Sequence, residues 1–172
     1  VKNTLDLNDE KFWYFCGRYL GDGWLRKRKD RNNNLSGVII CCGKHECEEL
    51  ESKIDGLFHY SKVEERTVFK YQFSNKELAH FLEKFGVGAK NKVVPGFVID
   101  LPTNILKSFL GGYFDSDGSF DGKKYKATSI SKKLLYGIGQ CVAKVYRRPY
   151  AIYQNKCNPQ HEIEGRIVNQ ND

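Results

Sequence analysis

The sequence predicts an α+β fold built from two related halves, and three observations support this. The segments "FCGRYLGDG" (15–23) and "LGGYFDSDG" (110–118) align position by position on their final Asp-Gly. Each closes a stretch with the apolar period of an α-helix, and each is followed by segments with the alternation of β-strands. An internal repeat of this kind predicts a pseudo-twofold arrangement, with a first half at 1–95 and a shortened second half at 96–172.

The two repeated helices are expected to pack closely against one another. Small residues recur four positions apart in each, as Gly17 with Gly21 and as Gly112 with Ser116. This spacing places a strip without large side chains on one helix face, where a second backbone can approach. The helices are expected to be capped by Asn8 and Thr103, respectively.

The segments after each repeated helix follow the same order. In the first half, a hairpin, a helix, two short strands and a closing helix are predicted, and Ser74 with Glu77 forms a capping box for the last of these. In the second half the order is terser: an extended segment, a helix and two further extended segments, at 125–131, 132–146, 148–156 and 161–168. The closing helix has no counterpart before Asp172, so the second repeat is predicted to be incomplete.

Composition favours a polyanionic partner and gives no membrane signal. The 28 basic and 21 acidic residues leave a formal charge of +7, with dense basic clusters at 26–31 and 144–150. Either cluster alone is equally well explained as solvated surface. No apolar run is long enough to span a membrane and no secretory leader is visible, which predicts an intracellular, cytoplasmic protein. The lack of methionine and the start at Val1 suggest a segment cut from a larger polypeptide, although an experimental truncation would look the same.

The six cysteines are expected to be reduced thiols. The densest group is "CCGKHEC" at 41–47, which lacks the paired spacing of a zinc site. Small apolar use of the thiol fits better than metal binding.

Two acids occupy equivalent positions at the ends of the repeated helices. Packing in parallel would bring Asp22 and Asp117, which are 95 residues apart, to one end of the pair. Two neighbouring carboxylates repel each other unless a proton or cation lies between them. A hard divalent cation such as Mg²⁺ prefers oxygen ligands of this kind.

At these residues the sequence resembles the LAGLIDADG homing endonucleases, in the single-chain form inserted in inteins. The second motif agrees with the family signature at five positions, and the first keeps three; these are Leu110, Gly112, Asp115, Asp117 and Gly118, and Gly17, Asp22 and Gly23. Arg18 departs from the signature and is expected to lie in solvent. The resemblance implies αββαββα repeats whose antiparallel sheets form a DNA-binding saddle.

The resemblance also implies a site for a Mg²⁺-dependent DNA endonuclease. Asp22 and Asp117 would be catalytic metal ligands, assisted by the backbone carbonyls of Gly21 and Ser116, with Mn²⁺ or Ca²⁺ able to occupy the same place. Lys92, three residues before a proline, would be the catalytic lysine. Lys90 is the alternative for that role. In the second half the candidate counterpart is Lys156 or a lysine beyond Asp172.

The implied partner is double-stranded DNA at a long, asymmetric target, bound by a monomer that acts as a pseudodimer. Polar residues of the extended segments are the candidate DNA contacts, although their strand faces cannot be assigned from sequence: Arg26, Arg28, Lys70, Gln72, Lys124, Lys126, Arg147 and Gln154. The rival hypothesis is a catalytically degenerate LAGLIDADG nucleic-acid-binding protein, such as an intron maturase or a transcription regulator. An unrelated enzyme with a basic surface would require the twin motifs to be coincidence.

Overall fold

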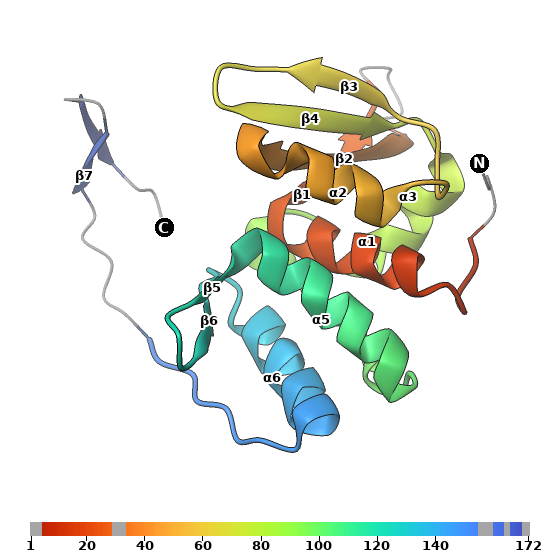
Figure 1. The fold of residues 1–172 in the computed structure, drawn as a ribbon. Coiled ribbons are helices and arrows are strands. Elements are labelled where there is room, and N and C mark those ends of the chain that lie inside the picture. The colour runs from red at the N-terminus through yellow and green to blue at the C-terminus, as the bar shows by residue number, and fades with distance from the viewer. Residues whose placement is uncertain (1–4, 29–33, 155–159, 164–165, 170–172) are drawn as a thin grey trace.

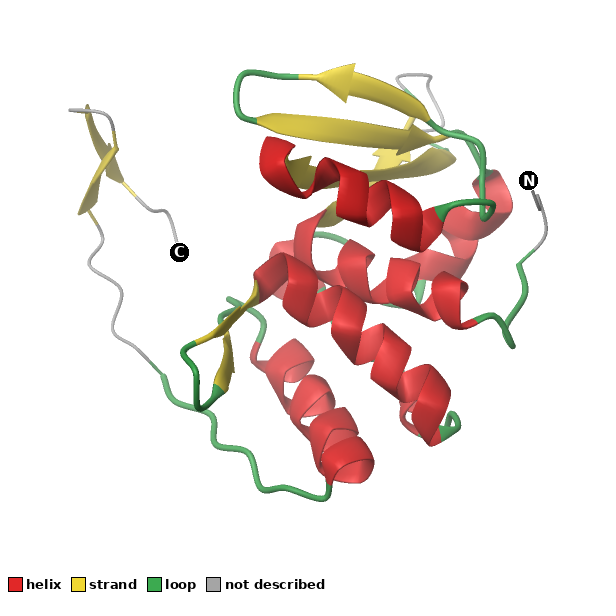
Figure 2. Ribbon diagram, viewed as in Figure 1, coloured by secondary structure: helices red, strands yellow, loops and turns green. Residues whose placement is uncertain are grey.

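The computed structural model describes residues 5–28, 34–154, 160–163 and 166–169, with side chains through residue 154. The helices and strands are α1 Glu10–Asp22, β1 Gly23–Lys27, β2 Leu35–Gly43, α2 Cys47–Ile54, β3 Ser61–Glu64, β4 Val68–Phe73, α3 Lys76–Glu83, α4 Gly96–Ile99, α5 Thr103–Asp117, β5 Gly118–Phe120, β6 Tyr125–Ala127, α6 Lys132–Tyr146, β7 Gln160–Ile163 and β8 Arg166–Asn169. Short 3₁₀ turns lie at Lys44–Glu46 and Ala89–Asn91. The α+β class is confirmed (Figures 1 and 2).

The first half forms one four-stranded antiparallel sheet in the order β1-β2-β4-β3. Its inner face packs on the helices, because alternate residues such as Val38, Ile40, Tyr71 and Phe73 are apolar and buried. Aromatic side chains extend this core, and the rings of Phe15 and Phe73 meet edge to face at 4.9 Å. The predicted hairpin and the strand pair of 62–74 are both present.

The long helices α1 and α5 pack side by side through their small residues (Figure 1). A Cβ atom on Gly17 would collide with the backbone carbonyl of Phe109 and lie 2.7 Å from the backbone nitrogen of Tyr113. A Cβ atom on Gly112 would collide in the same way with the carbonyl of Tyr14. Only glycine at these two positions lets the backbones approach this closely.

The second half has the same element order but a different sheet. Helix α6 packs on α5, and Ser131 caps it by accepting from the backbone N–H of Leu134. Strands β5 and β6 form one two-stranded ribbon, and β7 and β8 form another. Within the described residues these ribbons do not join into one four-stranded sheet, so the complete pseudo-twofold repeat remains a prediction.

Three predicted helix starts are displaced by one residue. Asp9, not Asn8, caps α1 by accepting from the backbone of Lys11. Pro102 precedes α5, which begins at Thr103 itself. Asn75 caps α3 because the neighbouring Ser74 hydroxyl is engaged by Arg26 instead. Among the described residues no helix is long and apolar enough to cross a membrane.

Candidate metal and nucleic-acid site

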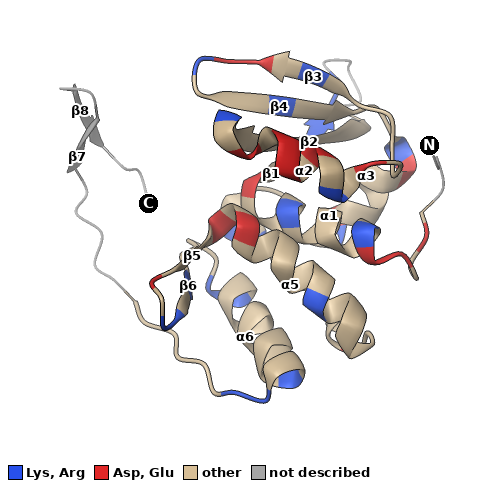
Figure 3. Cartoon of the chain, in the orientation of Figure 1, with Lys and Arg blue, Asp and Glu red and all other residues tan. Residues whose placement is uncertain are grey.

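The two packed helices end at the same place, and each ends on its acid. Asp22 is the last residue of α1 and Asp117 the last of α5. A Cβ atom on Gly21 would collide with the Ser116 hydroxyl and lie 3.3 Å from the carboxyl carbon of Asp117. The four residues of the two motif ends therefore meet in one place, and Figure 3 shows acidic segments where the two helices end.

Burial acts on both acids, and the charge of Asp117 acts in addition on Asp22. Burial raises the pKa of Asp22 above its usual value, and the charge of Asp117 raises it further. Burial also raises the pKa of Asp117. The positive charges of Arg18 and Lys92 oppose this for both acids, since a nearby cation stabilises the carboxylate.

Lys92 is the lysine that lies against this site. Its side chain is 9% exposed, and its ammonium donates to the carbonyl oxygens of Leu20 at 2.8 Å, Gly21 at 2.9 Å and Tyr19 at 3.3 Å. The carbonyls of Leu20 and Gly21 belong to the last turn of α1, where carbonyls lack intrahelical partners and a cation is favoured by the helix dipole. The carbonyl of Tyr19 also accepts from the backbone N–H of Gly23. Burial lowers the pKa of Lys92, and the two acids oppose that shift. Lys90, in contrast, is exposed.

Arg18 is buried, which corrects the expectation that it lies in solvent. Its side chain is 2% exposed, and its guanidinium donates to the carbonyl oxygens of Asp115, near the end of α5, and of Cys41 on β2. Glu46 lies 3.9 Å from the same guanidinium. Its position faces α5 rather than water because α1 is covered on this side by the second helix. Arg18 thus supplies for α5 the kind of terminal cation that Lys92 supplies for α1.

The pair of acids has the donor chemistry of a divalent cation site. No donor among the described side chains or backbone groups bonds to either carboxylate of Asp22 or Asp117, so their oxygens are available as ligands. The carbonyl oxygen of Gly21 already accepts a hydrogen bond from the Lys92 ammonium, which limits it as a metal ligand. The described residues contain no group of three or more His, Cys, Asp and Glu side chains suited to a metal. A cation here would therefore need further oxygens from outside the protein side chains.

Three candidate DNA-contacting residues share the outer face of the first sheet. Trp24 and Gln72 both pair with Ile39, and Lys70 pairs with Cys41. Side chains at paired and alternate positions point to the same face, so Arg26, Lys70 and Gln72 lie together, opposite the core. Trp24 is 41% exposed on this face, with the ammonium of Lys70 5.7 Å from its ring.

The other candidates are scattered. Arg28 directly follows β1, and Lys124 precedes β6 in an exposed turn. Lys126 is on β6 and forms an ion pair with Asp121 at 2.6 Å. Arg147 was expected beside an extended segment, but it ends α6 in the left-handed conformation with φ 50°. Gln154 is exposed and is not on a strand, and Lys156 lies outside the described residues.

Comparison with known proteins supports the LAGLIDADG resemblance. Residues 104–166, which include the whole second motif, match the family described as LAGLIDADG-like domain. The fold matches mesophilic variants of the homing endonuclease I-DmoI with a TM-score of 0.58, 16% identity, and coverage of 81% of this chain and 78% of that one. I-DmoI in complex with DNA and Mn matches with the same TM-score and identity. The LAGLIDADG resemblance is confirmed at the level of a domain match, which covers residues 104–166.

Segments of several archaeal enzymes are similar in sequence to this chain. The chain is 28% identical over 151 residues to the RNA polymerase subunit Rpo1C of Methanocaldococcus jannaschii, covering 84% of this chain and 17% of the relative. It is 31% identical over 114 residues to reverse gyrase of the same organism, covering 65% and 6%. It is 27% identical over 134 residues to a DNA polymerase of Thermococcus kodakarensis, covering 74% and 8%. The chain thus spans less than a fifth of the length of each of these relatives.

Proposed function

We propose that this chain is the endonuclease part of an intein, a site-specific enzyme that hydrolyses both strands of DNA with a divalent metal. The observation that carries the proposal is the meeting of Asp22 and Asp117 at the joined ends of α1 and α5, with carboxylate oxygens that no described donor occupies. The fold likeness to I-DmoI, which has been solved with DNA and Mn, supports it. Segments similar to this chain occur in an RNA polymerase subunit, a reverse gyrase and a DNA polymerase. Similar segments in unrelated host enzymes are expected of a mobile insertion.

In this proposal Asp22 acts at one strand of the DNA and Asp117 at the other. Asp22 and Asp117 would each hold a Mg²⁺ ion, or Mn²⁺ or Ca²⁺, beside one scissile phosphate, with the carbonyls of Gly21 and Ser116 as further oxygens. The ion, when bound, lowers the pKa of a water and neutralises charge on the phosphate. The carboxylates orient that ion, and the phosphate oxygens of the substrate complete its ligand set.

Lys92 contributes a fixed positive charge in this proposal. Its ammonium is held by three carbonyl oxygens, so it is placed to stabilise negative charge at the site without itself moving. Lys92 also links the halves, because its own carbonyl accepts from the Ser131 hydroxyl that caps α6. The catalytic constellation of Asp22, Asp117 and Lys92 is thereby supported by both halves, 1–95 and 96–172.

Binding would use the outer face of the sheets as a saddle on double-stranded DNA. Lys70 and Gln72 would face the major groove from the first half, with Arg26 beside them on the same sheet face, and Lys124 and Lys126 would do so from the second. Since the two sheets differ, the target would be long and asymmetric. One chain supplies both acids, so the active form would be a monomer acting as a pseudodimer.

Cleavage of a plasmid library in the presence of Mg²⁺ tests the proposal. Sequencing of the ends should show a defined double-strand cut that requires the metal. Binding of duplex DNA without any cut would favour the degenerate LAGLIDADG binder. Absence of both binding and cutting would contradict the proposal as a whole.

A further inference from the structure

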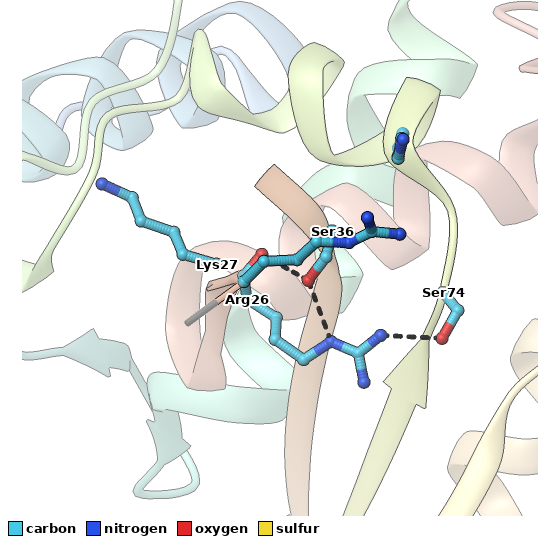
Figure 4. A pocket seen from close by; sticks show the side chains of 6 residues that line it. Arg26, Lys27, Ser36 and Ser74 are labelled. Carbon is cyan, nitrogen blue, oxygen red and sulfur yellow. Dashed lines mark hydrogen bonds between the residues drawn. The ribbon is translucent and has the colours of Figure 1, made fainter. Parts of the chain in front are cut away.

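A basic hollow lies at one flank of the first sheet, and neither Asp22 nor Asp117 lines it (Figure 4). It has a volume of about 420 Å³. Four of its lining residues are cationic and two carry hydroxyls: Arg26, Lys27, Arg28, Lys76, Ser36 and Ser74. None of the described lining residues is acidic, so the hollow presents a field of one sign.

Arg26 is held in place at this hollow by neutral acceptors. Its Nε donates to the Ser36 hydroxyl at 3.2 Å, and its two terminal nitrogens donate to Gln72 at 3.3 Å and to Ser74 at 2.8 Å (Figure 4 draws the two serine bonds). A guanidinium has five N–H donors, so two remain for a ligand. The side chain is therefore pre-organised while its charge is not neutralised by the groups that hold it.

A β-bulge explains why Ser36 takes part. Arg26 pairs with Gly37 and Lys27 pairs with Leu35, which leaves Ser36 as the extra residue on β2. A bulge redirects a side chain that regular alternation would place on the other face. The Ser36 hydroxyl both accepts from the Arg26 guanidinium and donates to its backbone carbonyl at 3.1 Å. The bulge thus places the Ser36 hydroxyl where it holds the Arg26 side chain in one orientation.

The other cationic side chains of the hollow likewise form no ion pair with an acid among the described residues. Among the described residues, no acid forms an ion pair with Arg26, Arg28 or Lys76, although Lys70 and Lys126 elsewhere on the surface are paired with acids. Lys76 is the first residue of α3, where the N-terminal end of the helix adds positive potential. Cations that no carboxylate neutralises, together with the Ser74 hydroxyl, fit the charge of a phosphate.

We propose that this hollow binds one backbone phosphate of DNA, outside the scissile positions, and anchors the duplex without reading its sequence. The inference rests on the proposed DNA-binding function and adds to it. It also assigns Arg26 and Arg28 a different task from base contact, together with Ser36, Ser74 and Lys76, which the sequence did not indicate as DNA contacts.

The test uses the full chain and duplex DNAs of unrelated sequences, with affinity measured as a function of salt. The variants are Arg28→Gln and Lys76→Gln, whose side chains make no hydrogen bond among the described residues. The charge-matched control is Lys107→Gln, at an exposed position of α5. Each hollow variant should weaken binding to every duplex about equally, on the order of tenfold for a charge-assisted contact. The salt slope of log affinity should become shallower by about 0.9, as expected for one phosphate fewer.

The outcomes separate this proposal from the function it rests on. Unchanged affinity and slope in both variants, with wild-type binding intact, would overturn the phosphate site and leave the endonuclease proposal standing. A loss confined to particular sequences would also overturn it, because it would indicate a base contact. A wild-type chain that binds no duplex DNA would overturn both.

Discussion

The ammonium of Lys92 donates to the carbonyl oxygen of Gly21 at 2.9 Å, directly beside Asp22. Arg18 makes the matching contact at the other helix, with the carbonyl of Asp115, two residues before Asp117. Both contacts place a buried cation where a helix end and an acid would otherwise concentrate negative charge. Two acids and two bases thus share one small volume, and substrate phosphates would complete the ligands of any bound cation.

Replacing Gly112 by alanine should destabilise the protein, whereas the same change at Gly111 should not. The added methyl at Gly112 would collide with the Tyr14 carbonyl, while at Gly111 the nearest atom is Tyr14 Cδ2 at 4.0 Å. We expect Gly112→Ala to lower the free energy of unfolding by roughly 1–3 kcal/mol, typical of overpacking. Gly111→Ala should be neutral or stabilising by up to about 1 kcal/mol through helix propensity. Urea unfolding measures both, and equal effects would refute the close contact of α1 with α5.

Removal of the Lys92 ammonium should affect both stability and the site. Lys92→Met would leave the carbonyls of Leu20 and Gly21 without their donor, at a cost of roughly 1–3 kcal/mol per buried group. Lys90→Met, at the exposed neighbouring lysine, should change the free energy of unfolding by no more than about 0.5 kcal/mol. Thermal unfolding of the two variants measures the difference, and similar melting temperatures would show that Lys92 does not hold the end of α1.

Neutralising either acid should stabilise the metal-free protein at neutral pH. The pKa of Asp22 and that of Asp117 are both raised on folding by burial, so the folded state favours the protonated forms. Stability from these two groups is therefore present at low pH and is lost as pH rises through their folded pKa values. Asp22→Asn or Asp117→Asn should raise the melting temperature near pH 7 and flatten this part of the pH dependence.

A divalent metal provides the control for that experiment. Mg²⁺ or Mn²⁺ should raise the melting temperature of the wild-type chain, since a ligand that binds only the folded state stabilises it, and should have less effect on either variant. Lower melting temperatures for both asparagine variants without metal would mean that the carboxylates form stabilising contacts, contrary to this account.

Arg18→Met should destabilise the junction between the two helices and β2. The carbonyls of Asp115 and Cys41 would each lose a donor, at a cost of roughly 1–3 kcal/mol per buried group. Arg18→Lys should recover only part of this, because an ammonium cannot reproduce the spread of the guanidinium donors. Denaturant unfolding of the pair measures the rescue. A methionine variant as stable as wild type would show that burial of the arginine charge cancels its contacts.

The helix pair was predictable because its signal is local. The spacing of Gly17 and Gly21, repeated at Gly112 and Ser116, predicts two helix faces without large side chains. In the structure the backbones of α1 and α5 approach closely along these faces. The first-half strands were equally predictable from alternation. The convergence of the motif ends follows from these two, because the acids are at fixed positions on helices that pack in register.

The features that sequence reasoning missed depend on tertiary surroundings. Arg18 has the hydropathy of a surface residue, and only the position of α5 over it makes it a buried donor. The signal was present, since an arginine replaced an apolar residue of the signature on a packed face. Arg147 closes α6 in a left-handed turn, which its residue type does not indicate. Ser74 matches a capping box, but Arg26 takes its hydroxyl and Asn75 caps instead.

The most direct test of the central claim is strand-resolved cleavage of a plasmid library with Mg²⁺ by wild type, Asp22→Asn and Asp117→Asn. Wild type should cut both strands at one site, and each variant should lose double-strand cutting by about a hundredfold or more, as expected when a metal ligand is removed. Double-strand cutting by either variant at the wild-type rate would contradict the assignment of Asp22 and Asp117 as the two halves of one catalytic site.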